Sequence, residues 1–171
     1  MNARVLQSEI AKDIEVLFSG DQFKTPELLP DDEAGEAEPE YNRHRMAALK
    51  TYEQFLPKRR TKDAEDPFPY VIVRIDGGGI ENQTDPHKVA VILVIGIYDD
   101  NPANQGHKAV LEIIERIQAH YEGTPLLAGQ FVFDDPFNWV LQDEQSWPYF
   151  YGACNLTFKL PAPRTKASDL V

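Results

Sequence analysis

Cysteine is nearly absent from this sequence: Cys154 is the only one in 171 residues. A single cysteine excludes an internal disulfide bond and any zinc site built from several thiolates. Cys154 lies on the apolar phase of a strand-like segment, which favours a buried, unreactive thiol over a catalytic nucleophile. The 4 histidines are scattered, without a pair at the spacing that metal-binding histidines use on one helix. We therefore expect no bound metal.

Positive charge is also scarce. The chain has 17 Lys and Arg against 28 Asp and Glu, which gives a formal net charge of −11. This balance argues against binding nucleic acid through its phosphates, so we expect no sequence-specific nucleic-acid partner. The longest apolar run, residues 89–98, is too short to cross a bilayer as a helix, and the N-terminus lacks a signal-peptide pattern. We expect synthesis in the cytoplasm and no membrane contact.

Catalytic motifs are missing as well. Gly77-Gly78-Gly79 follows a predicted strand, but no helix N-terminus follows it to hold a phosphate. Nor does the sequence contain the phosphate-binding motif that ends in Gly-Lys-Ser/Thr, or a Gly-x-Ser-x-Gly motif. We therefore predict no catalytic residues, no cofactor and no enzyme activity. One alternative stays open, a small metal-dependent enzyme whose strand-end carboxylates gather around an ion: Asp99, Asp100, Asp134, Asp135, Asp143 and Glu144.

The chain is organised around residues 88–121. The almost unbroken apolar run 89–98 predicts a central strand covered on both faces. Asn101 is a suitable N-cap and Pro102 a suitable first residue for the helix that follows, and Gly123 is placed to end it. The helix carries one apolar stripe at a spacing of three and four residues: Val110, Ile113, Ile114, Ile117 and Tyr121.

The flanking segments complete an α+β domain. Apolar periodicity predicts helices over 2–18 and 42–56, and strands over 70–76, 130–133, 137–142 and 150–160. Residues 134–136 are predicted to form a turn, and Gly152 to mark a bulge or a close backbone approach. The predicted order is α-α-β-β-α-β-β-β, with helices packed on one face of a mostly antiparallel sheet of about five strands. We expect a single domain over 1–163, an acidic loop or arm over 21–40, and a flexible tail over 164–171.

Two features suggest an interaction surface. The hairpin tip 77–87 is longer than a tight turn requires, and Arg74 interrupts an apolar strand, so one sheet face is open in a single chain. Aromatic residues concentrate in the last third, where they either fill the core or form a subunit interface. The candidate interface residues are Gly77, Gly78, Gly79, Ile80, Glu81, Asn82, Trp139, Trp147 and Tyr149. A solvated tip without function is the competing interpretation.

Several short motifs resemble a known family. They are Ile-Tyr-Asp-Asp-Asn-Pro at 97–102, Asn-Gln-Gly at 104–106, the segment 110–117, and Trp-Pro-Tyr-Phe-Tyr-Gly at 147–152. Together with the element order over 67–163, they resemble tail-terminator, or tail-completion, proteins of long-tailed phages, of the type carried by prophages of Gram-positive bacteria.

The resemblance implies a structural virion protein located at the tail end or neck. Such a protein forms a ring of six copies on the tail tube, ends tube growth and presents the head–tail joining surface. Its partners would be further copies of itself, the tail-tube protein and the head–tail connector. The alternative within virions is a head–tail connector component or a minor capsid protein.

Overall fold

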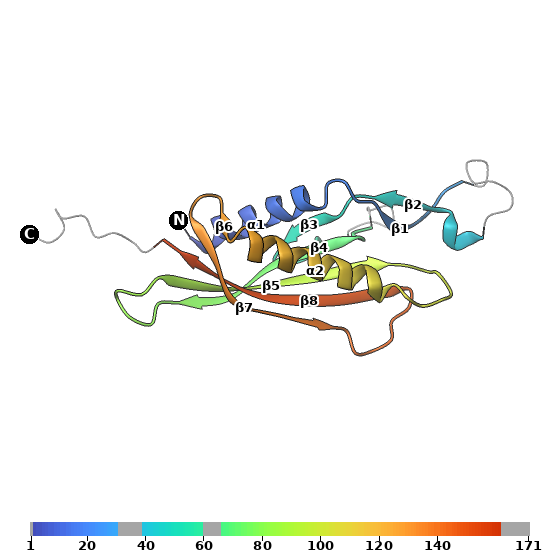
Figure 1. Cartoon of the computed structure of the whole chain (residues 1–171). Helices are drawn as coiled ribbons and strands as arrows, with labels where there is room; N and C mark the ends of the chain where they lie inside the picture. The colour runs from blue at the N-terminus through green and yellow to red at the C-terminus, as the bar shows by residue number, and fades with distance from the viewer. Residues whose placement is uncertain (1, 31–38, 60–65, 162–171) are drawn as a thin grey trace, which may run out of the picture.

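The computed structural model describes residues 2–30, 39–59 and 66–161. The fold is α+β, as predicted, with both helices on one face of a long curved sheet (Figure 1). In chain order the elements are α1 (Ala3–Leu17), β1 (Phe23–Leu28), a 3-10 turn (Glu40–Asn42), β2 (His44–Ala47), β3 (Lys50–Glu53), β4 (Tyr70–Gly79), β5 (His87–Tyr98), α2 (His107–Gly123), β6 (Leu126–Leu127), β7 (Phe131–Leu141) and β8 (Tyr149–Leu160). Neither helix in the described part of the chain is long and apolar enough to cross a membrane.

The main sheet has six strands in the order β3-β4-β5-β8-β7-β6, one more than the predicted number. All neighbours are antiparallel except β3 and β4, which are parallel. β5 lies near the middle and pairs with β8 along its whole length, from His87 opposite Leu160 to Tyr98 opposite Tyr149. β1 and β2 form a separate two-stranded sheet, which lies at the end of the molecule away from the β4–β5 turn (Figure 1).

The core lies between the sheet and the helices. Every second residue of β5, from Val89 to Ile97, points toward the helices and is buried, and the whole predicted stripe of α2 is buried against them. Burying each large aliphatic side chain contributes about 1.5–3 kcal/mol. This sheet–helix contact is therefore the main source of stability. Gly152 makes the predicted close approach: a Cβ there would lie 2.6 Å from the Val110 side chain.

The prediction that β5 is covered on both faces is wrong. Ile92 and Val94 point away from the helices and are only half-buried, beside the exposed Arg74 of β4. A continuous apolar run cannot show which of its two faces is covered, because alternate residues of a strand always point to opposite sides. The second face, here called the open face, carries neither helix and is partly covered by aromatic side chains such as Phe68 and Tyr149.

The predicted helix over 42–56 is also wrong. Its residues form the 3-10 turn and strands β2 and β3 instead. Met46, assigned to the apolar side of that helix, is about half exposed, whereas His44 is buried. The periodicity was too short to identify a helix, and pairing with β1 and β4 determines the local structure.

The start of the main helix and the turn at 134–136 differ from the prediction for local reasons. The main helix begins at His107, not at Pro102, because the Asn101 side chain accepts a hydrogen bond from the Ala103 N–H at 2.9 Å and forms a turn. The predicted turn at 134–136 is absent, and β7 runs through it with a register shift between Asp134 and Asn138. Pro136 is tolerated within this irregularity because ladder hydrogen bonds are interrupted there.

The acidic segment 21–40 is not simply a loop, since β1 occupies part of it and pairs with β2. Residues 31–38 lie outside the described residues, as does the predicted tail 164–171.

Candidate interaction surfaces

The predicted hairpin tip is shorter than expected. Gly77, Gly78 and Gly79 belong to β4, where they pair with Ala90, Val89 and Lys88 of β5. Beyond them, Ile80, Glu81 and Asn82 begin the tip and are all exposed, Ile80 to 47%. Asn82 donates a hydrogen bond to Asp85 at 2.9 Å, which ties the tip to itself.

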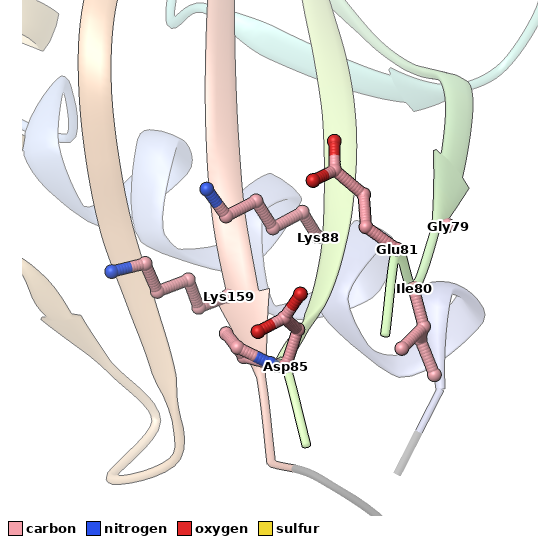
Figure 2. Close-up of a pocket in the computed structure, with 7 residues that line it drawn as sticks. Gly79, Ile80, Glu81, Asp85, Lys88 and Lys159 are labelled. Carbon is pink, nitrogen blue, oxygen red and sulfur yellow. The ribbon is translucent and has the colours of Figure 1, made fainter. Parts of the chain in front are cut away.

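A hollow of about 580 Å³ lies beside the tip (Figure 2). Lys88 and Lys159, directly opposite each other on β5 and β8, extend side by side along its edge. Their ammonium groups lie 3.4 and 3.8 Å from the Asp134 carboxylate. Glu81 and Asp85 line the hollow from the tip, so its charge is mixed. Mixed charge suits contact with a protein surface better than capture of one small anion or cation.

Two of the three glycines are not required by the chain's own packing. A Cβ added at Gly77 or at Gly79 would meet nothing within 4 Å, and neither residue has a positive φ. At Gly78, in contrast, a Cβ would lie 2.9 Å from the Lys88 carbonyl oxygen. Glycine weakens a strand by roughly 0.5–1 kcal/mol relative to alanine. Positions 77 and 79 therefore carry glycine at a cost that the described fold does not explain.

Trp139 lies on β7, near the edge of the sheet. It is 51% exposed, and its neighbour Val140 is 56% exposed on the opposite face. On the open face, Val140 joins Val94 and Ala153 around an apolar hollow of about 400 Å³. Exposed apolar side chains on both faces of one edge segment are typical of an interaction surface.

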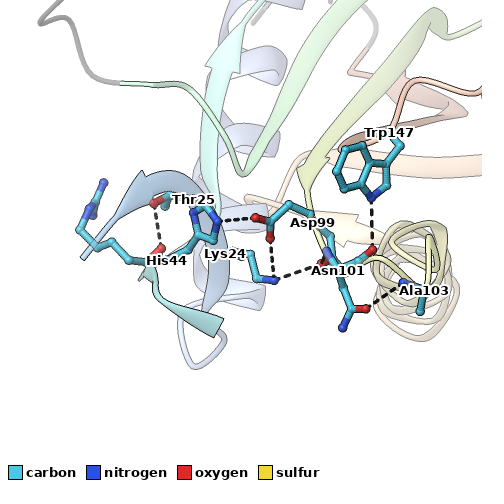
Figure 3. Close-up of polar contacts among 9 residues, drawn as sticks. Lys24, Thr25, His44, Asp99, Asn101, Ala103 and Trp147 are labelled. Atoms are coloured by element: carbon cyan, nitrogen blue, oxygen red, sulfur yellow. Dashed lines mark hydrogen bonds and ion pairs between the residues drawn. The ribbon is translucent and has the colours of Figure 1, made fainter. Parts of the chain in front are cut away.

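Trp147 and Tyr149 lie at the other end of the sheet from the hairpin tip. Lys88 and Tyr98 lie near the two ends of β5, and the ten steps along the strand between them span roughly 33 Å. Trp147 is 45% exposed, and its indole N–H donates to the Asn101 carbonyl oxygen at 3.2 Å (Figure 3). The candidate residues therefore form three separate surfaces: the tip, the β7 edge and the far end.

The Tyr149 ring belongs to an aromatic cluster on the open face. Its centroid lies 4.9 Å from that of Phe68 and 5.5 Å from that of Tyr98. Burial, with the nearby charge of Asp100, raises the pKa of Tyr98 to about 12. Tyr149 therefore has a structural role in addition to the predicted interface role.

A polar network that the sequence did not indicate joins the β1–β2 sheet to the main sheet (Figure 3). Lys24 of β1 lies 3.2 Å from a carboxylate oxygen of Asp99 and 3.2 Å from one of Asp100, just after β5. The second Asp100 oxygen lies 2.6 Å from Nε2 of the buried His44. Partial burial would raise the pKa of Asp100, but hydrogen bonds from His44 and Lys24 outweigh it and lower the pKa. The one trace of this network in the sequence is the Asp99-Asp100 pair.

The carboxylates of the metal-enzyme alternative do not gather. Asp99 and Asp100 bind Lys24 at one end of β5, whereas Asp134 binds Lys88 at the other end. Within residues 2–30, 39–59 and 66–161, no group of three or more His, Cys, Asp or Glu side chains is placed to hold a metal ion. Cys154 is fully buried, and burial raises its pKa to about 12, as expected for a core thiol.

Comparison with known proteins adds no identification. A scan against models of protein families finds no match, and a search of curated proteins finds none either. The functional conclusion therefore rests on the motifs quoted above and on this geometry.

Proposed function

We propose that this chain is a non-enzymatic structural protein of a phage virion. In this role it assembles as a ring, of six copies, caps the tail tube, ends tube growth and forms the head–tail joining surface. Its partners are further copies of itself, the tail-tube protein and the head–tail connector. The motifs at 97–102, 104–106, 110–117 and 147–152 support this proposal.

The observation that carries the proposal is the one-sided cover of the sheet. Both helices pack on one face, which leaves the open face without a helix, and the tip, the β7 edge and the far end each carry an exposed apolar side chain. Trp139, Trp147 and Ile80 are each close to half exposed. Three such surfaces suit a ring subunit between a tube and a connector, because such a subunit needs at least three contacts.

The first test measures assembly directly. Light scattering gives the mass of the purified chain over a range of concentrations, and negative-stain images show whether rings form, alone or on purified tail tubes. Rings that cap tubes and fix their length support the proposal. A chain that binds head connectors but never tail tubes indicates the connector or minor-capsid alternative instead.

A second test concerns the tip. Replacing residues 80–87 by Asn-Gly joins Gly79 to Lys88 through a two-residue turn, and it leaves all of β4 and all of β5 except its first residue, His87. We expect unchanged thermal unfolding and a loss of tube capping. A shortened chain that caps tubes and sets normal tail lengths would show that the tip is merely solvated.

A further inference from the structure

We propose that the outer edge of β4 pairs, as an antiparallel strand, with the outer edge of β7 from a second copy of this chain. The inference rests on the proposed self-assembly and specifies the contact through which it occurs. Gly77, Gly78 and Gly79 of one copy then lie opposite Val140, Trp139 and Asn138 of the next.

The β4 outer edge, defined as residues 76–79, lacks a neighbouring strand among the described residues. β3 pairs with β4 only from Tyr70 to Val73. The Gln54 side chain then closes this ladder, because its amide accepts from the Ile75 N–H at 2.9 Å and donates to the Ile75 carbonyl oxygen at 3.2 Å. Beyond Ile75, the backbone of β4 pairs only with β5.

The β7 outer edge, defined as residues 138–141, is open in the same sense. β6 pairs only with Phe131 and Val132, and the Phe133 N–H reaches the Pro125 carbonyl oxygen at 2.8 Å. After the register shift, the part of the chain that the structure describes provides no strand outside residues 138–141. Strand edges of this kind bind further strands readily unless they are blocked.

The outer edge of β3, in contrast, is blocked. The Thr51 N–H on β3 donates to the Glu15 carboxylate at 3.2 Å, and the Thr51 hydroxyl donates to the same oxygen at 2.6 Å. A carboxylate placed against the edge repels the carbonyl oxygens of an incoming strand and occupies the donor that it would need. Among the described long strands of the main sheet, the β4 and β7 outer edges are therefore open while the edge beside β3 is not.

The two outer edges match in direction and in length. β4 is antiparallel to β5, β5 to β8, and β8 to β7, so β4 and β7 run in opposite directions within one sheet. Two copies in the same orientation, placed edge to edge, therefore bring β4 and β7 together as an antiparallel pair. Residues 76–79 then face residues 141–138, four opposite four.

The faces also match. Gly78 lies opposite the buried Val89, and Trp139 opposite the buried Cys154, so both positions lie on the helix-covered side of their sheets. Pairing Gly78 with Trp139 consequently gives a continuous sheet with all helices on one side. A register shifted by one residue would put the helices of the two copies on opposite sides.

Backbone hydrogen bonding agrees with this register. The N–H and carbonyl groups of Ile75 point away from β5, toward Gln54. Because the register shifts by one residue between Ile75 and Gly77, Gly78 is the next residue whose N–H and carbonyl groups point away from β5. On β7 the Gln142 N–H points inward to the Tyr151 carbonyl, so Leu141 and Trp139 point outward by alternation. Gly78 and Trp139 can thus exchange both of their backbone hydrogen bonds.

Side-chain packing across the proposed contact is compatible with the glycines. Trp139, half exposed in one chain, lies across the side-chain-free Gly78 of the next copy, an arrangement in which an aromatic ring compensates for a strand glycine. Gly77 and Gly79, which the chain's own packing does not require, lie opposite Val140 and Asn138. The two outer edges lie on opposite sides of the sheet, one beyond β5 and the other beyond β8. The contact therefore runs head to tail and leaves each copy able to bind two neighbours.

Cross-linking tests the register. Gly79 and Asn138 would form a non-hydrogen-bonded pair, with Cα atoms about 4.5 Å apart, a separation that accepts a disulfide. We expect a mixture of the Gly79→Cys and Asn138→Cys chains to give a disulfide-linked dimer under mild oxidation. The matched control is Asn155→Cys, which is exposed on the same face but lies one strand further in, on β8. The buried Cys154 can stay in place.

Each outcome has a definite meaning. Efficient cross-linking of Gly79→Cys with Asn138→Cys, but not with Asn155→Cys, supports edge pairing. Equal cross-linking with both partners, or none while the unchanged chain still forms rings, overturns edge pairing and leaves the proposed function standing. An unchanged chain that never self-associates, in solution or on tail tubes, overturns both.

A second variant tests the tryptophan. Trp139→Lys should weaken self-association at least tenfold, which is the loss expected when one hot-spot residue of an interface is removed. The thermal midpoint of the single chain should stay unchanged. The control is Val16→Lys, because Val16 is 71% exposed on α1, away from both outer edges. Association that is equally strong in the Trp139→Lys and Val16→Lys chains would contradict the proposal.

Discussion

A single methyl group at Gly152 will test how closely α2 lies on β8. In the structure, an added Cβ would lie 2.6 Å from Cγ1 of Val110 and 3.3 Å from Cδ1 of Ile114. The first distance is far below van der Waals contact, and both side chains are fully buried, so neither can move into solvent. Overpacking of this kind costs about 1–3 kcal/mol, which is the expected loss for Gly152→Ala.

The reverse change at Val110 opens the same space. Val110→Ala removes two buried methyl groups, worth about 0.8 kcal/mol each, and leaves a small cavity, so a loss of about 2 kcal/mol is expected. In the double variant the new methyl at 152 occupies part of the space that Val110 vacates. The combined loss should therefore be smaller than the sum of the single losses, by about 0.5–3 kcal/mol.

Urea unfolding followed by far-ultraviolet circular dichroism measures all three variants. Gly79→Ala serves as the control, because its Cβ meets nothing within 4 Å and its φ is not positive. That variant should be as stable as the unchanged chain, or more stable by up to about 1 kcal/mol. Losses at Gly152 and Val110 that simply add would refute the assigned contact between α2 and β8.

Three further predictions use other parts of the molecule. Ile114→Ala should lower the free energy of unfolding by about 2–5 kcal/mol, because Ile114 is buried under α2, and an unchanged urea midpoint would contradict that placement. Asp100→Asn should destabilise the chain at neutral pH. Because the pKa of Asp100 is lowered, its contribution is complete above about pH 3.9 and is lost as the pH falls through the folded-state value. The stability difference from the unchanged chain should then shrink in acid, and a difference that is constant with pH would exclude the contact with His44 and Lys24. Cys154 should react with a thiol reagent only when urea unfolds the chain, and rapid reaction in the native state would disprove its burial.

The centre of the fold could be predicted from the sequence because its signals are long and mutually consistent. The ten-residue apolar run of β5, the alternation in β8 and the stripe of α2 each span several turns or pleats. All three elements are present, although α2 begins at His107 and not at the predicted Pro102. The predicted helix over 2–18 shows an equally regular apolar pattern, and its residues Leu6, Ile10 and Ile14 lie on one buried side. Long periodic segments leave little freedom of interpretation.

The segment before β4 could not be predicted because partners distant in sequence determine its structure. β2 and β3 are four-residue strands that exist through pairing with β1 and β4, and His44 is buried through its contact with Asp100. Short strands of this kind carry too few residues to show a period. Their tertiary contacts outweigh the weak helical pattern over 42–56.

The candidate surfaces could be predicted only in part. Sequence indicated the glycine run and the tryptophans but placed them in one group, whereas the structure separates the tip from Trp147 and Tyr149 by the length of β5. The importance of Trp139 depends on strand order, which puts β7 beside an edge that β6 covers only at Phe131 and Val132. Strand order is not visible in a single sequence.

The position of the tryptophans determines what the chain's intrinsic fluorescence will report. Trp139 and Trp147 are the only 2 tryptophans, and both are about half exposed to water in the single chain. Their emission should already lie at long wavelength before unfolding, so it will follow denaturation poorly. Burial of an indole in a contact between copies or with the tail tube would shift the emission to shorter wavelength. Comparing Trp139→Phe with Trp147→Phe would then assign that shift to the β7 edge or to the far end.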